Sequence, residues 1–436
     1  MRSWIGWGLC AVSMMCLTAC QSATPSAAAN KLQSCEIALA RHDGDARLDE
    51  EIRRLQQRIR AGLQQPAQQS LPMIERLGWS YVEKARASFD PGYYKLAEQC
   101  AACLEAKQAQ QSAEKQNASA LLLRGHVLHS LHRFAEAESL ARELVKERGL
   151  AFDFGLLGDA LMEQGKLDEA AAAYQRMMEL KPGPQAYSRA AHLRWMKGDT
   201  EVARALMRLS AQASGHGDAE ASAWAWSKLA LYELQAGRLK QAHAACEQSL
   251  AMQPNYAPAL LARGRVLLAE NKFDEAVSDL RQAAQANPLP EYHWTLADAL
   301  RAANREDEAG QIETKLAARG TGDDPRTFAL YLATRGRQTA TALKLAEDEL
   351  RNRRDAFTLD ALAWAQFAAG QKQQAWRTMQ SALAAGTLDA RLSLHAAVIA
   401  ANVGETAAAR RHSKQAFTFQ TALLPSERNY LRQLTR

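Results

Sequence analysis

Residues 151–182 read AFDFGLLGDALMEQGKLDEAAAAYQRMMELKP, and residues 257–288 read APALLARGRVLLAENKFDEAVSDLRQAAQANP. Small, apolar, turn-forming and proline residues stand at the same offsets in both stretches. The matching pairs are Gly158 with Gly264, Leu161 with Leu267, Gly165 with Asn271, Ala170 with Ala276, Tyr174 with Leu280, and Pro182 with Pro288. Self-similarity at fixed offsets predicts a protein built from structural repeats.

Each repeat is expected to form two helices joined by a tight turn. A glycine or alanine where the helices cross lets them approach closely, and a glycine or asparagine at the turn takes the left-handed conformation that ends the first helix. The proline ends the second helix because it cannot continue the hydrogen-bond ladder. Glycine and proline are otherwise sparse, at 24 and 12 of 436 residues, which favours an all-α fold.

The turn residue can be followed along most of the chain, at intervals of 33, 33, 39, 34, 33, 32, 34 and 34 residues. The long interval contains the glycine-rich segment 213–218. This series resembles the tetratricopeptide repeat, a helix–turn–helix unit of about 34 residues. The resemblance covers residues 118–420 as about nine repeats and implies a right-handed superhelical α-solenoid. The turn positions are His132, Gly165, Gly198, Gly237, Asn271, Asn304, Gly336, Gly370 and Gly404.

The ends of the repeat array are less regular. Residues 35–117 are expected to form N-terminal helices that include one irregular hairpin of the same type. Residues 421–436 are expected to form a capping helix, because an uncapped solenoid end would expose its core.

The first residues are typical of a secretory signal peptide, with Arg2 followed by a short apolar stretch and small residues. That stretch is shorter than a membrane-spanning helix requires. Leu17-Thr18-Ala19-Cys20 resembles the lipobox of bacterial lipoproteins. The resemblance implies that residues 1–19 are removed, that the Cys20 thiol receives lipid (with palmitate among the acyl groups), and that residues 20–34 are a flexible tether. Gln21, in place of aspartate, implies the outer membrane, with the protein facing the periplasm.

Charge and motifs limit the function classes. The net charge is +6, from 54 basic and 48 acidic side chains, and we interpret it as a mild excess spread along the chain. A nucleic-acid-binding protein usually concentrates its excess in a patch, so no nucleic-acid partner is expected. The sequence has no zinc-protease, phosphate-loop or nucleophile-elbow motif. We therefore predict no enzyme, no cofactor and no small-molecule substrate.

Removal of the signal peptide leaves five cysteines: Cys20, Cys35, Cys100, Cys103 and Cys246. Because the periplasm is oxidising, a disulfide from Cys35 to either Cys100 or Cys103 is our preferred interpretation. Buried free thiols are the alternative, and a redox function of Cys100 and Cys103 is a third. Cys246 is expected to be a small apolar core residue.

Three histidines, His126, His129 and His132, stand three residues apart. A metal site would need a further ligand and converging geometry, so we predict no metal and expect groove-lining or solvated side chains. An envelope redox or metal-dependent accessory protein, using these histidines or the Cys100/Cys103 pair, is the alternative function.

The tetratricopeptide family implies that clients bind in the concave groove formed by the first helices. Aromatic and arginine side chains are enriched where binding energy concentrates. Trp195 and Trp294 are assigned to the groove, whereas Trp224 and Trp364 are left open between groove and core. The predicted function is a scaffold or assembly factor, anchored by lipid, that binds envelope proteins or peptides. The expected partner-binding residues are His126, His129, His192, Trp195, Trp224, Arg265, Trp294, Arg301 and Trp364.

Overall fold

The computed structural model of the chain describes residues 27–62, 67–109, 118–214 and 219–434. Cys20 and the expected signal peptide lie outside the described residues. The described part is helical throughout and has no strand, so the all-α solenoid prediction is confirmed. Among the described helices, none combines the length and apolarity needed to cross a bilayer.

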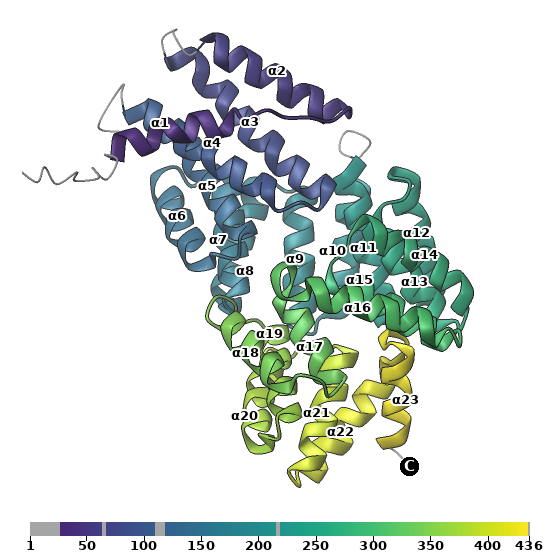
Figure 1. Cartoon of the computed structure of the whole chain (residues 1–436). Coiled ribbons are helices and arrows are strands. Elements are labelled where there is room, and N and C mark those ends of the chain that lie inside the picture. The colour runs from purple at the N-terminus through teal and green to yellow at the C-terminus, as the bar shows by residue number, and fades with distance from the viewer. Residues whose placement is uncertain (1–26, 63–66, 110–117, 215–218, 435–436) are drawn as a thin grey trace, which may run out of the picture.

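The helices follow one another as a long series of hairpins (Figure 1). Their bounds are α1 Ala27–Ala38, α2 Arg47–Gly62, α3 Ala67–Ser88, α4 Gly92–Ala109, α5 Ala118–Ser130, α6 Phe134–Glu147, α7 Ala151–Glu163, α8 Leu167–Leu180, α9 Pro184–Met196, α10 Thr200–Ala213, α11 Ala219–Gln235, α12 Leu239–Met252, α13 Ala257–Ala269, α14 Phe273–Ala286, α15 Pro290–Ala302, α16 Glu306–Asp323, α17 Pro325–Thr334, α18 Thr339–Leu350, α19 Ala356–Ala368, α20 Lys372–Leu383, α21 Ala390–Asn402, α22 Thr406–Thr418, the 3-10 turn η1 Gln420–Ala422 and α23 Pro425–Leu434.

Nine successive hairpins, α5/α6 to α21/α22, make up the array in the described chain. All nine turn positions followed in the sequence have positive φ, from 59° at His132 to 85° at Gly404. The left-handed conformation at each position ends the first helix of its hairpin, as the sequence predicts.

Small residues let the two helices of a hairpin pack closely against each other. A Cβ atom placed on Gly264 of α13 would lie 2.6 Å from Cγ of Leu280 on α14. Leu280 is fully buried at this crossing. Close approach of the helix backbones therefore explains the small residue at this offset.

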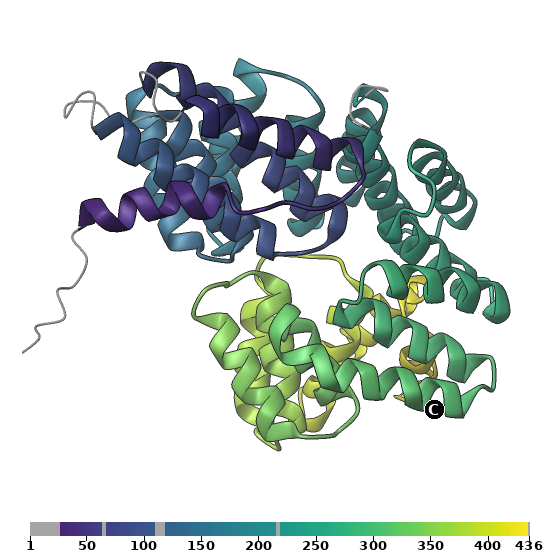
Figure 2. The same ribbon diagram turned by 45° about the horizontal axis from the view of Figure 1, so that its top comes forward.

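The array makes more than one superhelical turn, and its last repeats pack against the middle ones. In Figures 1 and 2, α17–α22 lie beneath α7–α10. The Thr387 hydroxyl donates to the Met196 carbonyl at 2.6 Å across 191 residues, and the Thr421 hydroxyl donates to the Leu234 carbonyl at 3.0 Å across 187 residues. One superhelical turn thus takes about 190 residues, and the loops of successive turns meet.

Side chains also contribute to this contact between successive superhelical turns. Arg353 pairs with Glu163 at 2.6 Å, and its guanidinium lies 5.1 Å from the Phe134 ring. Phe357 at the start of α19 stacks on Trp195 of α9, with ring centroids 5.4 Å apart. We call this set of contacts between successive turns the inter-turn contact.

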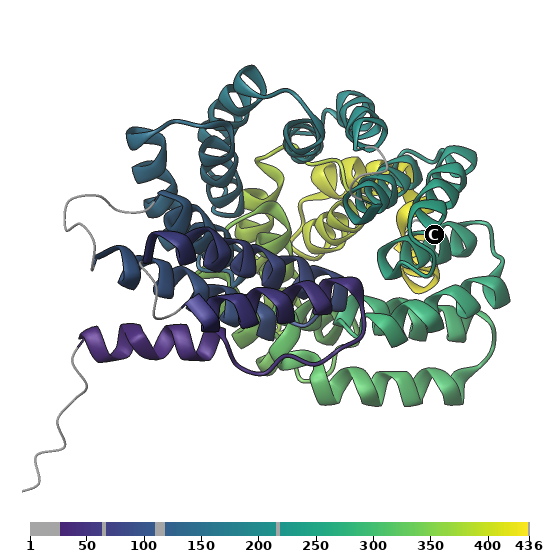
Figure 3. The ribbon, with the colours of Figure 1, turned by 90° about the horizontal axis from the view of Figure 1, so that it is seen from above.

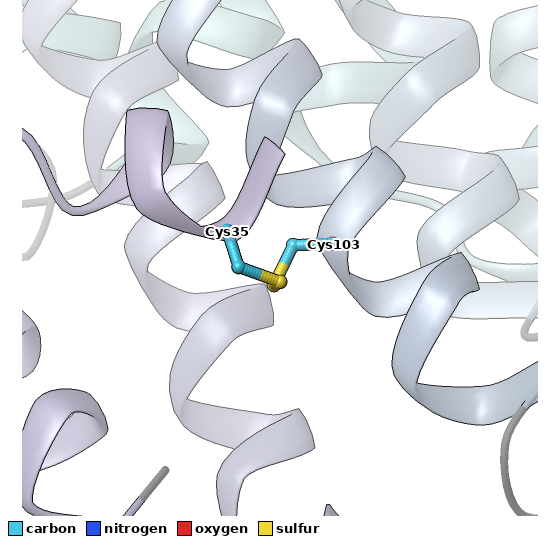
Figure 4. Close-up of a disulfide and its surroundings, with 2 residues drawn as sticks. All are labelled: Cys35 and Cys103. Carbon is cyan, nitrogen blue, oxygen red and sulfur yellow. A yellow bond between two sulfur atoms is a disulfide. The ribbon is translucent and has the colours of Figure 1, made fainter. Parts of the chain in front are cut away.

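The N-terminal helices α1–α4 pack around a core that they share with α5, the first helix of the array. A disulfide joins Cys35 on α1 to Cys103 on α4 (Figure 4), one of the two pairings left open from the sequence, and Cys100 remains a buried thiol. The predicted tether, residues 20–34, needs correction. Helix α1 already begins at Ala27, because Ala27–Ala38 is rich in helix formers and the disulfide fixes it to α4.

The C-terminal helix α23 covers the end of the array and also reaches back to the first superhelical turn. Ser426 donates its backbone N–H to the Asp298 carboxylate at 3.1 Å, and Arg428 donates to the Leu268 carbonyl at 2.6 Å. The last element therefore contributes to the inter-turn contact as well as capping the final hairpin.

Candidate functional site

A cavity of about 980 Å³ lies on the inner side of the superhelix. We call it the inner chamber. First helices α5, α7, α9, α11 and α13 supply most of its wall, and Figure 3 shows these helices curving around the view axis, with the later helices beneath them. Asp389 and Ala422, from the second superhelical turn, contribute to its far side. The chamber is therefore bounded by both turns of the array.

Aromatic rings line the chamber as a connected series. Trp195 stacks on His192 at 5.8 Å and on Tyr232 at 5.4 Å between ring centroids. His192 Nδ1 lies 3.2 Å from the Tyr232 hydroxyl. Trp79 of α3 and His126 form a separate, tilted pair, with ring centroids 5.4 Å apart. These rings present an apolar wall with few polar atoms.

Two of the chamber histidines, His126 and His192, are neutral bases. Burial lowers the pKa of His126 to about 3 and that of His192 to about 4 because the charged imidazolium loses its hydration. Both rings therefore remain uncharged at neutral pH. They contribute stacking surface and single hydrogen bonds rather than positive charge.

Most charged groups of the chamber are already paired. Arg189 Nη2 lies 2.7 Å from the Asp159 carboxylate. Arg265 contacts Glu291 at 3.3 Å and donates to the Ala422 carbonyl at 2.9 Å. These groups stabilise the wall and are only partly available to a ligand.

Lys228 is different, because it has no ion-pair partner among the described residues. Its Nζ lies 5.9 Å from the Trp224 ring centroid, and burial lowers the pKa of its amine. Trp195 Nε1 is likewise buried without a hydrogen-bond acceptor in the described structure. The chamber thus presents one cation without a carboxylate partner, Lys228, beside aromatic surface.

The predicted partner-binding residues divide into two groups. His126, His129, His192, Trp195, Trp224 and Arg265 line the chamber. Trp294 needs correction: it is only 3% exposed and borders a smaller neighbouring pocket rather than the chamber. Trp364, which the sequence left open between groove and core, is 6% exposed and belongs to the core. Arg391 lies 4.6 Å from the Trp294 ring, and His395 stacks on Trp364 at 4.0 Å. The second superhelical turn therefore covers a surface that would be open groove in a solenoid of only one superhelical turn.

Arg301 also needs correction. It pairs with Glu306 and Glu313, each at 2.9 Å, and does not line the chamber. Conversely, Lys228, Tyr232 and Gln235 were not predicted. They recur with Trp224 on one face of α11 at helical spacing, and that spacing is the signal in the sequence that would have found them.

The alternative redox and metal readings gain no support from the geometry. Cys103 is in the disulfide, and burial raises the pKa of the Cys100 thiol, which disfavours the reactive thiolate. His132 sits in the turn and stacks on Phe134 at 5.5 Å, outside the chamber lining that holds His126 and His129. Across the described residues, no group of three or more metal-ligating side chains converges.

Stacked hairpins around an inner chamber define a solenoid scaffold, a class whose repeats form extended binding surfaces for other proteins. Two family models described as tetratricopeptide repeat match the chain, over residues 156–219 and 233–294. The chain is a tetratricopeptide-repeat protein. Proteins of this family generally act as interaction scaffolds rather than as enzymes.

Known proteins share parts of this pattern. Sperm-associated antigen 1 of Rattus norvegicus is 34% identical over 95 residues, which are 22% of this chain and 11% of that protein. The chain thus spans a small part of that relative.

Three solved structures are also similar. MamA has a TM-score of 0.31 and 19% identity, covering 37% of this chain and 93% of its own. A tetratricopeptide repeat protein from Parabacteroides merdae has a TM-score of 0.37 and 14% identity, and the match covers 62% of this chain and 93% of that one. A chain of the APC/C hetero-tetramer Cut9-Hcn1 has a TM-score of 0.36 and 14% identity, and the match covers 92% of this chain and 98% of that one.

Proposed function

We propose that this protein is a lipid-anchored scaffold of the bacterial outer membrane that holds a segment of an envelope protein in the inner chamber. The observation that carries the proposal is the chamber wall of α9 and α11, where the Lys228 amine has no carboxylate partner and lies over Trp224, and where Trp195 lines the same chamber. A cation beside aromatic surface favours a ligand with both acceptor and apolar groups.

The size of the chamber supports a short segment rather than a folded domain. Ligand sites of about 300–1,000 Å³ enclose groups of drug or short-peptide size, and the chamber is about 980 Å³. A loop or chain end of the client would place one or two side chains against Trp224 and Trp195. The rest of the client would remain outside the solenoid.

Replacing Trp224 by alanine together with Lys228 by glutamine is expected to weaken client binding by about tenfold or more, because a buried aromatic anchor is a typical binding hot spot. The measurement is quantitative affinity purification from membranes of cells that express each variant. Tyr430→Ala is the matched control, since Tyr430 is a half-exposed aromatic on α23 that does not line the chamber. Equal recovery of every client from both variants would place binding outside the chamber.

Replacing Cys20 by serine is expected to abolish incorporation of labelled palmitate and to release the protein from the outer-membrane fraction, because serine offers no thiol for lipid attachment. Gln21→Asp should keep the lipid and shift the protein toward the inner membrane, as the lipoprotein resemblance implies. Labelling and density-gradient fractionation measure both. Retention of the Cys20→Ser protein in the outer membrane would refute the anchor while leaving the chamber proposal intact.

A further inference from the structure

The net positive charge of the chain is concentrated toward its C-terminal end. Residues 372–436 contain nine Lys/Arg and three Asp/Glu, which gives a net charge of +6, whereas residues 1–371 contain 45 of each sign and are neutral. The interpretation that the excess is spread along the chain is therefore wrong. All of it belongs to the last two hairpins and the segment that follows them.

Within that end, the charge lies on the two outer helices. In α20 and α22, Lys372, Arg377, Arg410, Arg411 and Lys414 are all exposed. Neither helix contains an aspartate or a glutamate, whereas every other second helix, from α4 to α18, contains at least one. We call these five side chains the basic end face.

The cations of the basic end face are not used by the fold. None of the five forms an ion pair with a carboxylate in the described structure, and the one described contact, from Arg411, is with the neighbouring His412. By contrast, Arg281 on α14 and Arg305 at the N-cap of α16 share Glu308 at 2.7 and 2.6 Å. Unpaired like charges within one helical turn repel one another, so the basic end face reduces stability unless something binds it.

We propose that the basic end face is a second docking surface, separate from the inner chamber, that binds the acidic face of a partner protein. Arg377, Arg410 and Arg411 offer planar donor pairs that match carboxylates in two-point contacts. Glutamine side chains at 373, 374 and 380 are exposed between the cations on α20 and add neutral donors and acceptors. Such a surface fits carboxylates spread over a folded face.

A membrane surface fits less well. Helices that bind lipid headgroups add large apolar side chains for insertion, but α20 and α22 have no exposed large apolar residue among their described residues. Helices α20 and α22 also lie near the bottom of Figure 1, away from α1 near the top. A polyanion such as DNA would match the charge of this surface, but proteins of the tetratricopeptide-repeat family generally bind other proteins.

The experiment compares Arg410→Gln/Arg411→Gln/Lys414→Gln with a control that removes the same charge elsewhere. Arg281→Gln/Arg305→Gln/Lys315→Gln is that control, because Arg281 lies on α14, Arg305 at the N-cap of α16 and Lys315 on α16, and both arginines pair with Glu308. The residues replaced in the two variants are exposed, except that Arg305 is partly buried. Circular dichroism checks that both variants keep the helical fold of the full-length protein.

The probes are a fluorescent peptide with eight glutamates, a DNA duplex, and vesicles with or without phosphatidylglycerol in phosphatidylcholine. Any lipid anchor contributes equally to both vesicle types, so their difference isolates headgroup charge. At low salt, we expect the acidic peptide to lose about tenfold or more in affinity in the basic-end-face variant and little in the control. Raising the ionic strength to about 0.15 M should narrow the difference, because exposed charges are then screened.

Two results would overturn the proposal. The first is an equal loss of peptide binding in both variants, which would mean that the effect depends on net charge alone. The second is a larger loss for DNA or for the anionic vesicles than for the peptide, which would assign the surface to a different macromolecule. Trp224→Ala/Lys228→Gln should bind the acidic peptide as the wild type does, so failure here and failure of the chamber proposal are separable.

Discussion

Gly198→Ala is expected to destabilise the protein by about 2–5 kcal/mol, the largest effect of adding one methyl group at any glycine of the array. Gly198 has a φ of +79°, and an added Cβ would overlap the backbone carbonyl oxygen of Gly386 in the next superhelical turn. The left-handed conformation costs an alanine about 1–2 kcal/mol, and forcing apart two packed backbones costs about 1–3 kcal/mol more. Thermal unfolding followed by circular dichroism measures the loss.

Gly404→Ala separates these two contributions. Gly404 has a similar φ of +85°, but an added Cβ would meet nothing within 4 Å. This variant should lose only the conformational part. Its Arg354 amide, which donates to the Glu163 carbonyl at 2.8 Å across the inter-turn contact, should keep normal protection in hydrogen exchange. If Gly404→Ala and Gly198→Ala are equally destabilised, the inter-turn contact contributes little to stability.

Cys35→Ala is expected to destabilise the N-terminal helices by about 2–4 kcal/mol. The disulfide to Cys103 closes a loop with a sequence separation of 68 residues, and the chain-entropy model assigns about 4 kcal/mol to a loop of this length. Because α1 packs mainly on α4, its loss should expose α4 first. Limited proteolysis and hydrogen exchange over residues 33–109 report this local unfolding.

Cys100→Ala is the matched control for the disulfide. It removes a buried sulfur from α4 but keeps the bond between Cys35 and Cys103. Adding a reductant should bring the wild type to the level of Cys35→Ala and should leave Cys35→Ala unchanged. A reductant that has no effect on wild-type stability would show that packing alone holds α1.

The sequence predicted the local structure of the array well, because a repeat is defined by contacts between neighbours. Each turn residue from His132 to Gly404 takes the conformation that its chemistry favours. The same local logic placed His192 and Trp195 in the groove, and both line the chamber. No long-range information was needed for any of these, since first helices repeat their orientation from one hairpin to the next.

The contact between superhelical turns was not predictable in this way. It joins residues about 190 positions apart, and whether they meet depends on the small rotation that each hairpin adds. Trp294 was assigned to the groove because a single turn would leave it open, and the second turn buries it. The basic end face was missed for a simpler reason, because charge was judged over the whole chain rather than by segment.

The inter-turn contact also limits how this chain can evolve. Solenoids commonly gain or lose whole repeats, since each unit contacts only its neighbours. Here, deleting one hairpin between Glu163 and Arg353 would shift the second turn by one unit relative to the first. Thr387 would no longer face the Met196 carbonyl, and Gly386 would no longer lie against Gly198. Natural variants should therefore vary in loop length and surface charge while keeping the number of hairpins in this interval constant.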